Sequence, residues 1–293
     1  MAGMRWGNWL KAGFLGSVGA GLAASAAVAA LPQDRGIGFQ PAATEVMRDV
    51  TTLHNVLLVI ITLITALVLA LLLWVIIRYN RKMNPAPRKF SHNVLVEIVW
   101  TVVPALILVF ISVPSFQLLY KQDVIPEPDL TIKTVGQTWY WDYVYPDHGG
   151  FEFSSLLLEG DPLPSGAPNP IAGPDGVPKL FAVDNPMVVP VGKVVQLQVT
   201  SSPTGVIHSW ALPAFGVKMD AIPGRLNVTW FKVDQPGDYH GQCSEICGIR
   251  HAYMPIHVRA LPEPEFNAWV AQQQSAYGIA AAPQTAPIFA SAQ

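Results

Sequence analysis

The sequence predicts a membrane-anchored α+β protein, in which an N-terminal two-helix transmembrane hairpin precedes an all-β domain. Of the 293 residues 51% are hydrophobic and only 13% are charged, which is too apolar for an ordinary soluble enzyme of this size. Beyond residue 121 the composition changes, and short β-rich runs alternate with Gly, Pro and Asp. The formal charge of −2 and the absence of a long basic run argue against nucleic acid as a partner.

Residues 1–30 are typical of a secretory signal peptide. Arg5 and Lys11 precede a middle rich in Gly, Ala, Leu and Val, and small residues precede Leu31. A retained transmembrane helix is the alternative, but the Gly and Ala content makes this stretch weakly hydrophobic. We therefore expect cleavage, which leaves the mature N-terminus outside the cytoplasm.

Residues 31–120 are predicted to form an N-terminal tail and the hairpin, with membrane spans at about 53–77 and 94–119. Roughly 20 apolar residues suffice to cross a bilayer. The short loop between the spans holds five basic residues and no acid, which marks the cytoplasmic side: Arg78, Arg81, Lys82, Arg88 and Lys89. The second span therefore returns the chain to the outer side of the membrane.

Glu97 lies in the first turn of the second span, close to the cytoplasmic face. Two interpretations stay open from physical chemistry alone. A carboxylate here favours the helix N-terminus and reaches the headgroup region. An ionisable residue at this depth is also a candidate for a proton path.

Residues 121–262 are predicted to form an all-β sandwich or barrel outside the membrane. Its β-rich runs are residues 130–135, 138–145, 187–189, 194–200, 227–233 and 256–258. A Pro- and Gly-rich insert at 156–179 indicates a surface loop. In the final segment, 263–293, we expect one short helix around 265–275 and then a disordered tail.

Both cysteines of the chain lie in one loop, Gln-Cys-Ser-Glu-Ile-Cys-Gly-Ile-Arg-His-Ala-Tyr-Met, at residues 242–254. Cys243 and Cys247 are followed in the same loop by His251 and Met254. Thiolate, imidazole and thioether together form a soft set of ligands suited to copper, and two thiolates can bridge two metal ions. His208, in a β-like stretch upstream, is the natural candidate for a second imidazole.

A disulfide and a zinc site are the alternatives for this loop. An even cysteine count in an exported protein usually indicates a disulfide. A three-residue spacer, however, closes a small and weakly constraining loop, and a disulfide gives no reason for a nearby His and Met. Structural zinc prefers a Cys/His tetrad and accepts a thioether poorly. Copper is therefore favoured over both.

The pattern Cys-Ser-Glu-Ile-Cys-Gly-x-x-His-x-x-Met, with the upstream His-Ser-Trp, resembles the dinuclear copper A signature of subunit II of haem-copper cytochrome c oxidases, in its bacterial form. The resemblance extends from about residue 54 to 258 and implies a cupredoxin-like Greek-key barrel. It implies that two copper ions are bridged by the two cysteines. The implied copper ligands are His208, Cys243, the Glu245 backbone carbonyl, Cys247, His251 and Met254.

The same resemblance implies the function and its setting. Electrons would pass from cytochrome c to copper A and on to haem, held only in subunit I, for dioxygen reduction coupled to proton pumping. The Glu245 side chain would help bind magnesium shared with subunit I. The protein would lie in the bacterial inner membrane with its C-terminal domain in the periplasm, alongside subunit I, other oxidase subunits and lipid.

The resemblance also assigns roles outside the copper loop. Trp139, the first tryptophan of Trp-Tyr-Trp-Asp-Tyr, would lie exposed above the copper and receive the electron, although packing is the alternative for any single ring. Glu97 would lie at the entrance of the K proton channel, which is formed mainly by subunit I. Asp220 and Arg225 would lie at the interface with subunit I.

Cytochrome c carries a lysine-rich face, so docking calls for carboxylates around Trp139. The expected docking acids are Asp142, Asp147, Glu152 and Asp184. Two acids usual in the family are missing, because this chain has Gly205 and Val144 in their place. We therefore expect a thinner or displaced acidic patch and a weaker dependence of association on salt.

Two rival functions belong to other classes. Quinol oxidases keep the fold in a subunit without copper, but the complete ligand set argues against that reading. Periplasmic reductases such as nitrous oxide reductase carry a copper A domain, but the two spans and the absence of propeller-like repeats weigh against them.

Overall fold

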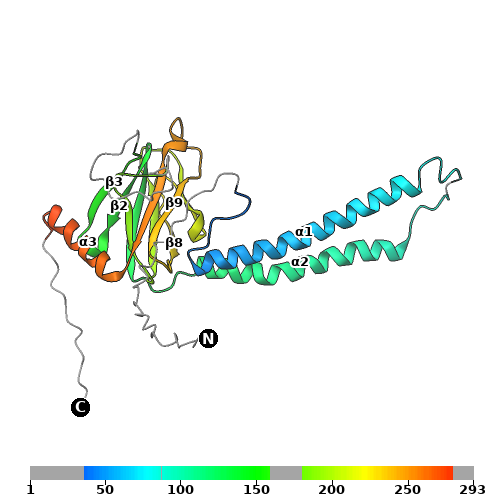
Figure 1. Ribbon diagram of the computed structural model, residues 1–293, viewed down its shortest axis with the longest axis horizontal. Helices are drawn as coiled ribbons and strands as arrows, with labels where there is room; N and C mark the ends of the chain where they lie inside the picture. Colours follow the sequence, from blue (N-terminus) through cyan, green and yellow to red (C-terminus); the bar gives the residue numbers. More distant parts are fainter. Residues whose placement is uncertain (1–35, 87, 159–179, 280–293) are drawn as a thin grey trace, which may run out of the picture.

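The computed structural model describes residues 36–86, 88–158 and 180–279. Two long helices, α1 (Glu45–Arg78) and α2 (Val94–Asp123), form a hairpin that projects from a β-sandwich (Figure 1). The predicted signal peptide, most of the insert and the far end of the C-terminal tail lie outside the described residues. Their predictions therefore stay untested.

The hairpin has the length and composition of two membrane spans. Its apolar side chains point outward along most of both helices, as expected where lipid surrounds them. α1 begins at Glu45, before the predicted start of the first span, because the Met47 N–H donates to Thr44 Oγ1 at 3.0 Å and so caps the helix. Its first turn therefore precedes the membrane-spanning part.

The first turn of α1 is held against the sandwich by hydrogen bonds. The Thr44 hydroxyl donates to the Phe215 carbonyl at 2.8 Å, and the Ala43 N–H donates to the Ala214 carbonyl at 2.8 Å. At the same level Lys121 of α2 forms ion pairs of 2.6 Å with both Glu45 and Asp49 of α1. The base of the hairpin and the sandwich are thus joined.

The first sheet of the sandwich has the strand order β3-β2-β1-β5-β8. Its strands are β1 (Leu130–Gln137), β2 (Tyr140–Tyr145), β3 (Phe151–Ser155), β5 (Val195–Ser201) and β8 (Asn227–Phe231). Burial alternates strictly along β1 and β5, because successive side chains of a strand point to opposite faces. The inward set, which includes Leu130, Ile132 and Leu197, builds half of the core.

The second sheet has the order β4-β10-β9-β6-β7. Its strands are β4 (Met187–Pro190), β6 (His208–Leu212), β7 (Val217–Ala221), β9 (Gly237–Cys243) and β10 (Pro255–Leu261). Together the two sheets confirm the predicted all-β, cupredoxin-like domain. No β-rich run was predicted at β3, β7 or β9. The short helix η2 (Pro213–Phe215) precedes β7.

The outer face of β9 and β10 carries a buried polar cluster. The Asp238 carboxylate accepts hydrogen bonds from His257 Nε2 at 2.7 Å and Arg259 Nε at 2.8 Å, and the His257 ring stacks on His240 at 4.4 Å between centroids. Burial opposes ionisation of Asp238, but the bonds to His257 and Arg259 outweigh it and lower the pKa of this carboxyl. The cluster ties together the two strands that flank the cysteine loop.

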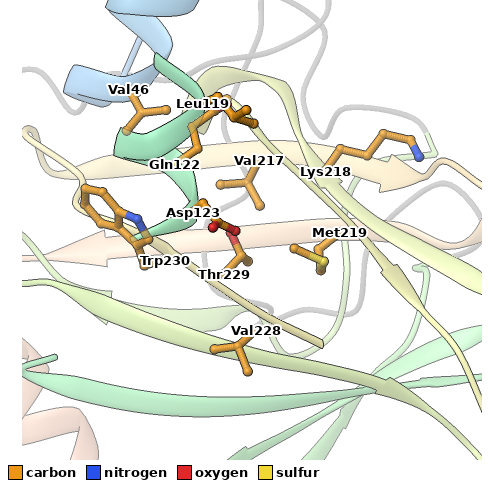
Figure 2. Close-up of a pocket in the computed structure, with 11 residues that line it drawn as sticks. Val46, Leu119, Gln122, Asp123, Val217, Lys218, Met219, Val228, Thr229 and Trp230 are labelled. Atoms are coloured by element: carbon orange, nitrogen blue, oxygen red, sulfur yellow. The ribbon is translucent and has the colours of Figure 1, made fainter. Parts of the chain in front are cut away.

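A helix and a cavity complete the described structure. α3 (Glu263–Ala276) packs its Trp269 ring against Tyr145 and Phe151, with centroids 5.2 and 5.7 Å away. Where the hairpin meets β7 and β8, a cavity of about 240 Å³ is lined by the end of α2 and by Trp230, with Asp123 at its centre (Figure 2).

Candidate metal centre

The pairing of β6 with β9 brings together ligands that are far apart in the sequence. His208 opens β6 and Cys243 closes β9, and the antiparallel register places Trp210 opposite Cys243. The Cys243 N–H donates to the Met254 carbonyl at 3.0 Å, so the cysteine loop returns to its own starting point. His208 and the loop therefore meet at one rim of the sandwich.

Cys243 and Cys247 are both free thiols and both buried, at 5% and 4% exposure. Their Sγ atoms lie 3.7 Å apart, whereas a disulfide requires about 2.05 Å. The structure therefore does not contain the disulfide considered from the sequence. Two unjoined sulfurs at this separation leave room for shared metal ligation.

Each sulfur has an imidazole nitrogen of its own nearby. His208 Nδ1 lies 3.9 Å from Cys243 Sγ, and His251 Nδ1 lies 3.6 Å from Cys247 Sγ. The ligand atoms of His208 and the two cysteines all lie within 4.8 Å of one another. The donor set, with two thiolates between two imidazoles, fits a pair of soft cations such as copper.

Met254 and Glu245 complete the predicted ligand set. Met254 is fully buried at the start of the strand that leaves the loop. The Glu245 carbonyl oxygen lies 3.3 Å from Cys243 Sγ, while its side chain is exposed. The Glu245 backbone carbonyl therefore lies beside the sulfurs, whereas its side chain lies at the surface of the domain.

The pKa shifts of two predicted ligands favour an exchange of protons for metal at this site. Burial, followed by the neighbouring Cys243, raises the pKa of the Cys247 thiol to about 12. Burial and the nearby His251 lower the pKa of His208. At neutral pH His208 is therefore neutral and able to bind metal directly, while Cys247 must release its proton when metal binds.

Gly136 of β1 supports the His208 ring, a role that sequence analysis did not predict. A Cβ atom at Gly136 would lie only 2.7 Å from His208 Cδ2. Trp141, the cross-strand partner of Gly136, meets the same ring edge-on, with centroids 5.9 Å apart. Gly136 lies between the predicted β-rich runs 130–135 and 138–145, and a glycine within a strand can mark such a close approach.

Trp139 lies directly on the cysteine loop. Its Nε1 donates to the Cys247 carbonyl at 2.9 Å, and a Cβ atom at Gly248 would lie 3.1 Å from its ring. Trp139 is half-buried, whereas Trp141 and Tyr143 of the same aromatic run are fully buried in the core. Among these rings, Trp139 is the one that joins the cysteine loop to the surface.

The four predicted docking acids do not surround Trp139. Asp142 is 6% exposed, and its two oxygens accept bonds from Gln137 Nε2 at 2.8 Å and Ser154 Oγ at 2.6 Å. The prediction that Asp142 docks a partner is therefore wrong, because a carboxylate satisfied inside the sheet cannot meet a lysine outside. Asp147 follows the far end of β2, in the short helix η1 (Pro146–His148), and accepts from the Thr131 N–H.

Asp147 and Glu152 are exposed, and Asp184 is half-buried. Glu152 is exposed on the edge strand β3, opposite Val144, and contributes after burial and Asp142 to the raised pKa of Tyr140. Asp184 accepts from the Leu156 and Asn185 N–H groups and so stabilises a turn. Glu152 and Asp142 both act on Tyr140, whereas Asp184 belongs to the turn after β3.

The remaining predicted residues are Glu97 in α2, Asp220 in β7 and Arg225 in the turn that follows β7. Glu97 Oε1 accepts from the Asn93 N–H at 3.3 Å, while Asn93 Oδ1 accepts from the Leu95 N–H at 3.1 Å. This reciprocal cap is the helix-terminus role that the sequence left open for Glu97. Asp220 pairs with Lys218 at 3.2 Å in β7.

Arg225 is exposed in the turn that follows β7. The turn is closed by a bond from the Arg225 N–H to the Ile222 carbonyl at 3.1 Å. Gly224 within it has φ +75°, a left-handed conformation that favours glycine.

The chain matches two family descriptions: "Cytochrome C oxidase subunit II, periplasmic domain" over residues 130–261 and "Cytochrome C oxidase subunit II, transmembrane domain" over residues 32–118. It is 46% identical to a probable cytochrome c oxidase subunit 2 of Rickettsia bellii over 237 residues, covering 81% of this chain and 84% of the relative. It is 45% identical over 251 residues to cytochrome c oxidase subunit 2 of Cereibacter sphaeroides, covering 82% and 81%.

Among solved structures, the periplasmic domain of subunit II of cytochrome oxidase of Bradyrhizobium japonicum is 50% identical. The match covers 53% of this chain and 99% of that one, with a TM-score of 0.45.

We predict that Gly136→Ala will displace the His208 ring, because the new methyl group would occupy space 2.7 Å from Cδ2. Copper binding should weaken by about tenfold or more, the loss expected when a supporting contact of a ligand is disturbed. Titration of the purified variant with copper, followed by absorption, measures this. Thr138→Ala, at a neighbouring exposed position, is the control, and equal affinity in the two variants would exclude a supporting role for Gly136.

Proposed function

Because the chain belongs to the cytochrome c oxidase subunit II family, we propose that its sandwich holds a dinuclear copper A centre that accepts electrons from cytochrome c and passes them to haem in subunit I. The observation that carries the proposal is the pair of free, buried sulfurs 3.7 Å apart, each with an imidazole nitrogen within 3.9 Å. A subunit that binds no copper would not need two free cysteines and two histidines in this arrangement.

In this proposal the two cysteines bridge both copper ions. The other ligands are His208, His251, Met254 and the Glu245 carbonyl. When bound, copper supplies an acceptor whose single electron is shared by two metals. The chain's own contribution is burial, since both sulfurs, His208 and Met254 are shielded from water and the ligand loop is pinned at both ends.

The membrane anchor and the domain outside it define the setting. We place the sandwich on the periplasmic side of the bacterial inner membrane, because the basic loop between the two helices marks the cytoplasmic side. We propose that the Glu245 side chain, which is exposed, shares a magnesium ion with subunit I. Asp220 and Arg225 are assigned to the same interface, on the β7 side of the metal centre.

Trp139 is proposed as the point where electrons arrive. Its indole bonds directly to the Cys247 carbonyl, and its ring is partly open to solvent. The solvent-exposed ring and its hydrogen bond therefore give a short route from the surface to Cys247, a proposed metal ligand. Asp147, Glu152 and Asp184 remain as acids proposed for a docking role, whereas the buried Asp142 does not.

We predict that the sandwich with α3, produced without the hairpin, will bind two copper ions and show a purple mixed-valence absorption spectrum. Cys243→Ser and Cys247→Ser should each abolish this spectrum, because one bridging sulfur cannot hold both ions. His148→Asn, remote from the sulfurs, is the control and should leave the spectrum intact. A single bound copper, or a colourless zinc form from cells supplied with copper, would contradict the proposal.

We predict that Trp139→Phe will slow reduction by cytochrome c by about tenfold or more, a loss of about 1.4 kcal/mol or more in the barrier. Phenylalanine keeps an aromatic ring over Gly248 but lacks the indole N–H that bonds to Cys247, so the copper spectrum should survive. Stopped-flow reduction of the purified oxidase measures the rate, with Tyr140→Phe as the control. Normal reduction of the Trp139 variant would refute its role.

We predict that Glu97→Gln will slow proton uptake and turnover without altering the copper spectrum. Glutamine keeps an oxygen that accepts from the Asn93 N–H, so the helix cap survives while the ionisable group is lost. Turnover and proton uptake of the oxidase in vesicles measure the effect, and Asn93→Asp, which keeps a capping side chain, is the control. Unchanged turnover in Glu97→Gln would contradict a role in proton uptake and show that Glu97 only caps the helix.

A further inference from the structure

The cavity between the hairpin and the sandwich lies where α2 leaves the membrane (Figure 2). It has a volume of about 240 Å³ and is bounded by the last turns of α2, by β7 and by β8. Leu119 is the last residue of the predicted second span, and Gln122 and Asp123 line the cavity just beyond it. The neighbouring Tyr120 is exposed, as expected of a ring at the membrane–water interface. The cavity therefore lies at the level of the lipid headgroups on the side of the sandwich.

Trp230 of β8 brings an unpaired hydrogen-bond donor to this cavity. Its Nε1 atom is buried and has no hydrogen-bond partner among the described residues. Figure 2 shows the ring nitrogen on the side of the indole that faces Asp123. A buried N–H group without an acceptor costs free energy, so the cavity favours a bound molecule that supplies one.

Asp123 gives the cavity a free carboxylate. The residue is exposed, and within the part of the chain that the structure describes its side chain forms neither an ion pair nor a hydrogen bond. Lys218 lines the β7 side of the cavity, and its side chain is 55% exposed although it pairs with Asp220 at 3.2 Å. The cavity thus offers an acceptor for a cation on α2 and donors for an anion on β7 and β8.

Apolar side chains supply much of the remaining wall, namely Val46 of α1, Leu119 of α2 and Val217 of β7. Leu119 is exposed and continues the apolar surface of the α2 membrane span. Gly216 closes the wall against α1, because a Cβ atom at this position would lie 3.3 Å from Met47 Cα. A ligand with a charged head and an apolar tail fits such a cavity better than a free ion does.

We propose that the cavity binds the headgroup of phosphatidylethanolamine, a phospholipid with a primary ammonium group and a phosphate. The ammonium group pairs with Asp123, the phosphate accepts hydrogen bonds from Trp230 Nε1 and the Lys218 ammonium, and the acyl chains follow Leu119 into the bilayer. A primary ammonium group donates hydrogen bonds to a carboxylate, whereas the trimethylammonium group of phosphatidylcholine has no N–H to donate. The bound headgroup joins α2 to β7 and β8. The inference goes beyond the proposed function and does not depend on copper.

The test uses the intact detergent-purified oxidase and a phosphatidylethanolamine probe with a photoactivatable group at the start of one acyl chain. After illumination, the cross-linked peptides are mapped by mass spectrometry. We expect cross-links to the peptides that contain Leu119 and Val217. Unlabelled phosphatidylethanolamine should compete at least about fivefold better than phosphatidylcholine, because only the first donates to Asp123. Water-soluble glycerophosphoethanolamine, which has the same headgroup and no acyl chains, should not compete at the same concentration.

Variants assign the contacts. Asp123→Asn should lower the cross-linking yield by about fivefold or more and remove the preference over phosphatidylcholine. Trp230→Phe keeps most of the ring but lacks the N–H group, and should lower the yield by a similar factor. Glu127→Gln removes a nearby exposed carboxylate, and Trp74→Phe removes an indole exposed on the membrane span of α1. Both are controls and should keep the yield of the unmodified oxidase.

Four results would overturn the proposal. They are the absence of cross-links to the cavity peptides, equal competition by the two phospholipids in the unmodified oxidase, full competition by glycerophosphoethanolamine, and loss of subunit I from the purified Asp123→Asn or Trp230→Phe oxidase. The last result would show that subunit I fills the cavity. Competition in the unmodified oxidase tests the proposal even where a variant does not fold. The copper spectrum is measured on the same samples, so failure of the copper proposal is seen separately from failure of lipid binding.

Discussion

The close approach of β6 and β9 is the contact on which the metal centre depends. At Gly241 a Cβ atom would lie 2.0 Å from the Ala211 carbonyl oxygen, so only glycine lets the two strands come this near. The same register sets Trp210 opposite Cys243 and brings His208 within reach of the sulfurs. His208 and Cys243, 35 positions apart in the chain, become neighbours because Gly241 has no side chain to hold the strands apart.

Around this contact, each ligand is held by groups that do not bind metal. The His208 ring packs against Gly136 and Trp141, the Cys247 carbonyl accepts a bond from Trp139, and the Met254 carbonyl accepts a bond from the Cys243 N–H. The outer bonds of Asp238 to His257 and Arg259 fix the two strands that flank the loop. Such support lets a site keep its shape while its charge changes, because few atoms are free to move.

The sequence predicted those parts of the fold and site that consist of contiguous residues. Two apolar stretches gave the hairpin, and four soft ligands within one loop indicated copper before any geometry was known. Contacts between distant strands could not be predicted from the sequence. The residues next to Gly136 and Gly241 do not show that His208 approaches the first glycine and the Ala211 carbonyl the second. β9 was missed because it holds two glycines and few β-branched residues. Asp142 looked available because burial of a carboxylate within a sheet depends on partners supplied by other strands, Gln137 and Ser154.

The base of the hairpin is attached to the sandwich by more than its covalent links. Thr44 and Ala43 bond to the 213–216 turn, Arg48 pairs with Asp234 at 2.6 Å, and Lys121 locks α2 to α1. These contacts restrict rotation of the sandwich about the hairpin. The hairpin therefore sets the height and tilt of the proposed copper centre relative to the membrane. An electron leaving that centre would cross a gap whose width changes little when the domain moves.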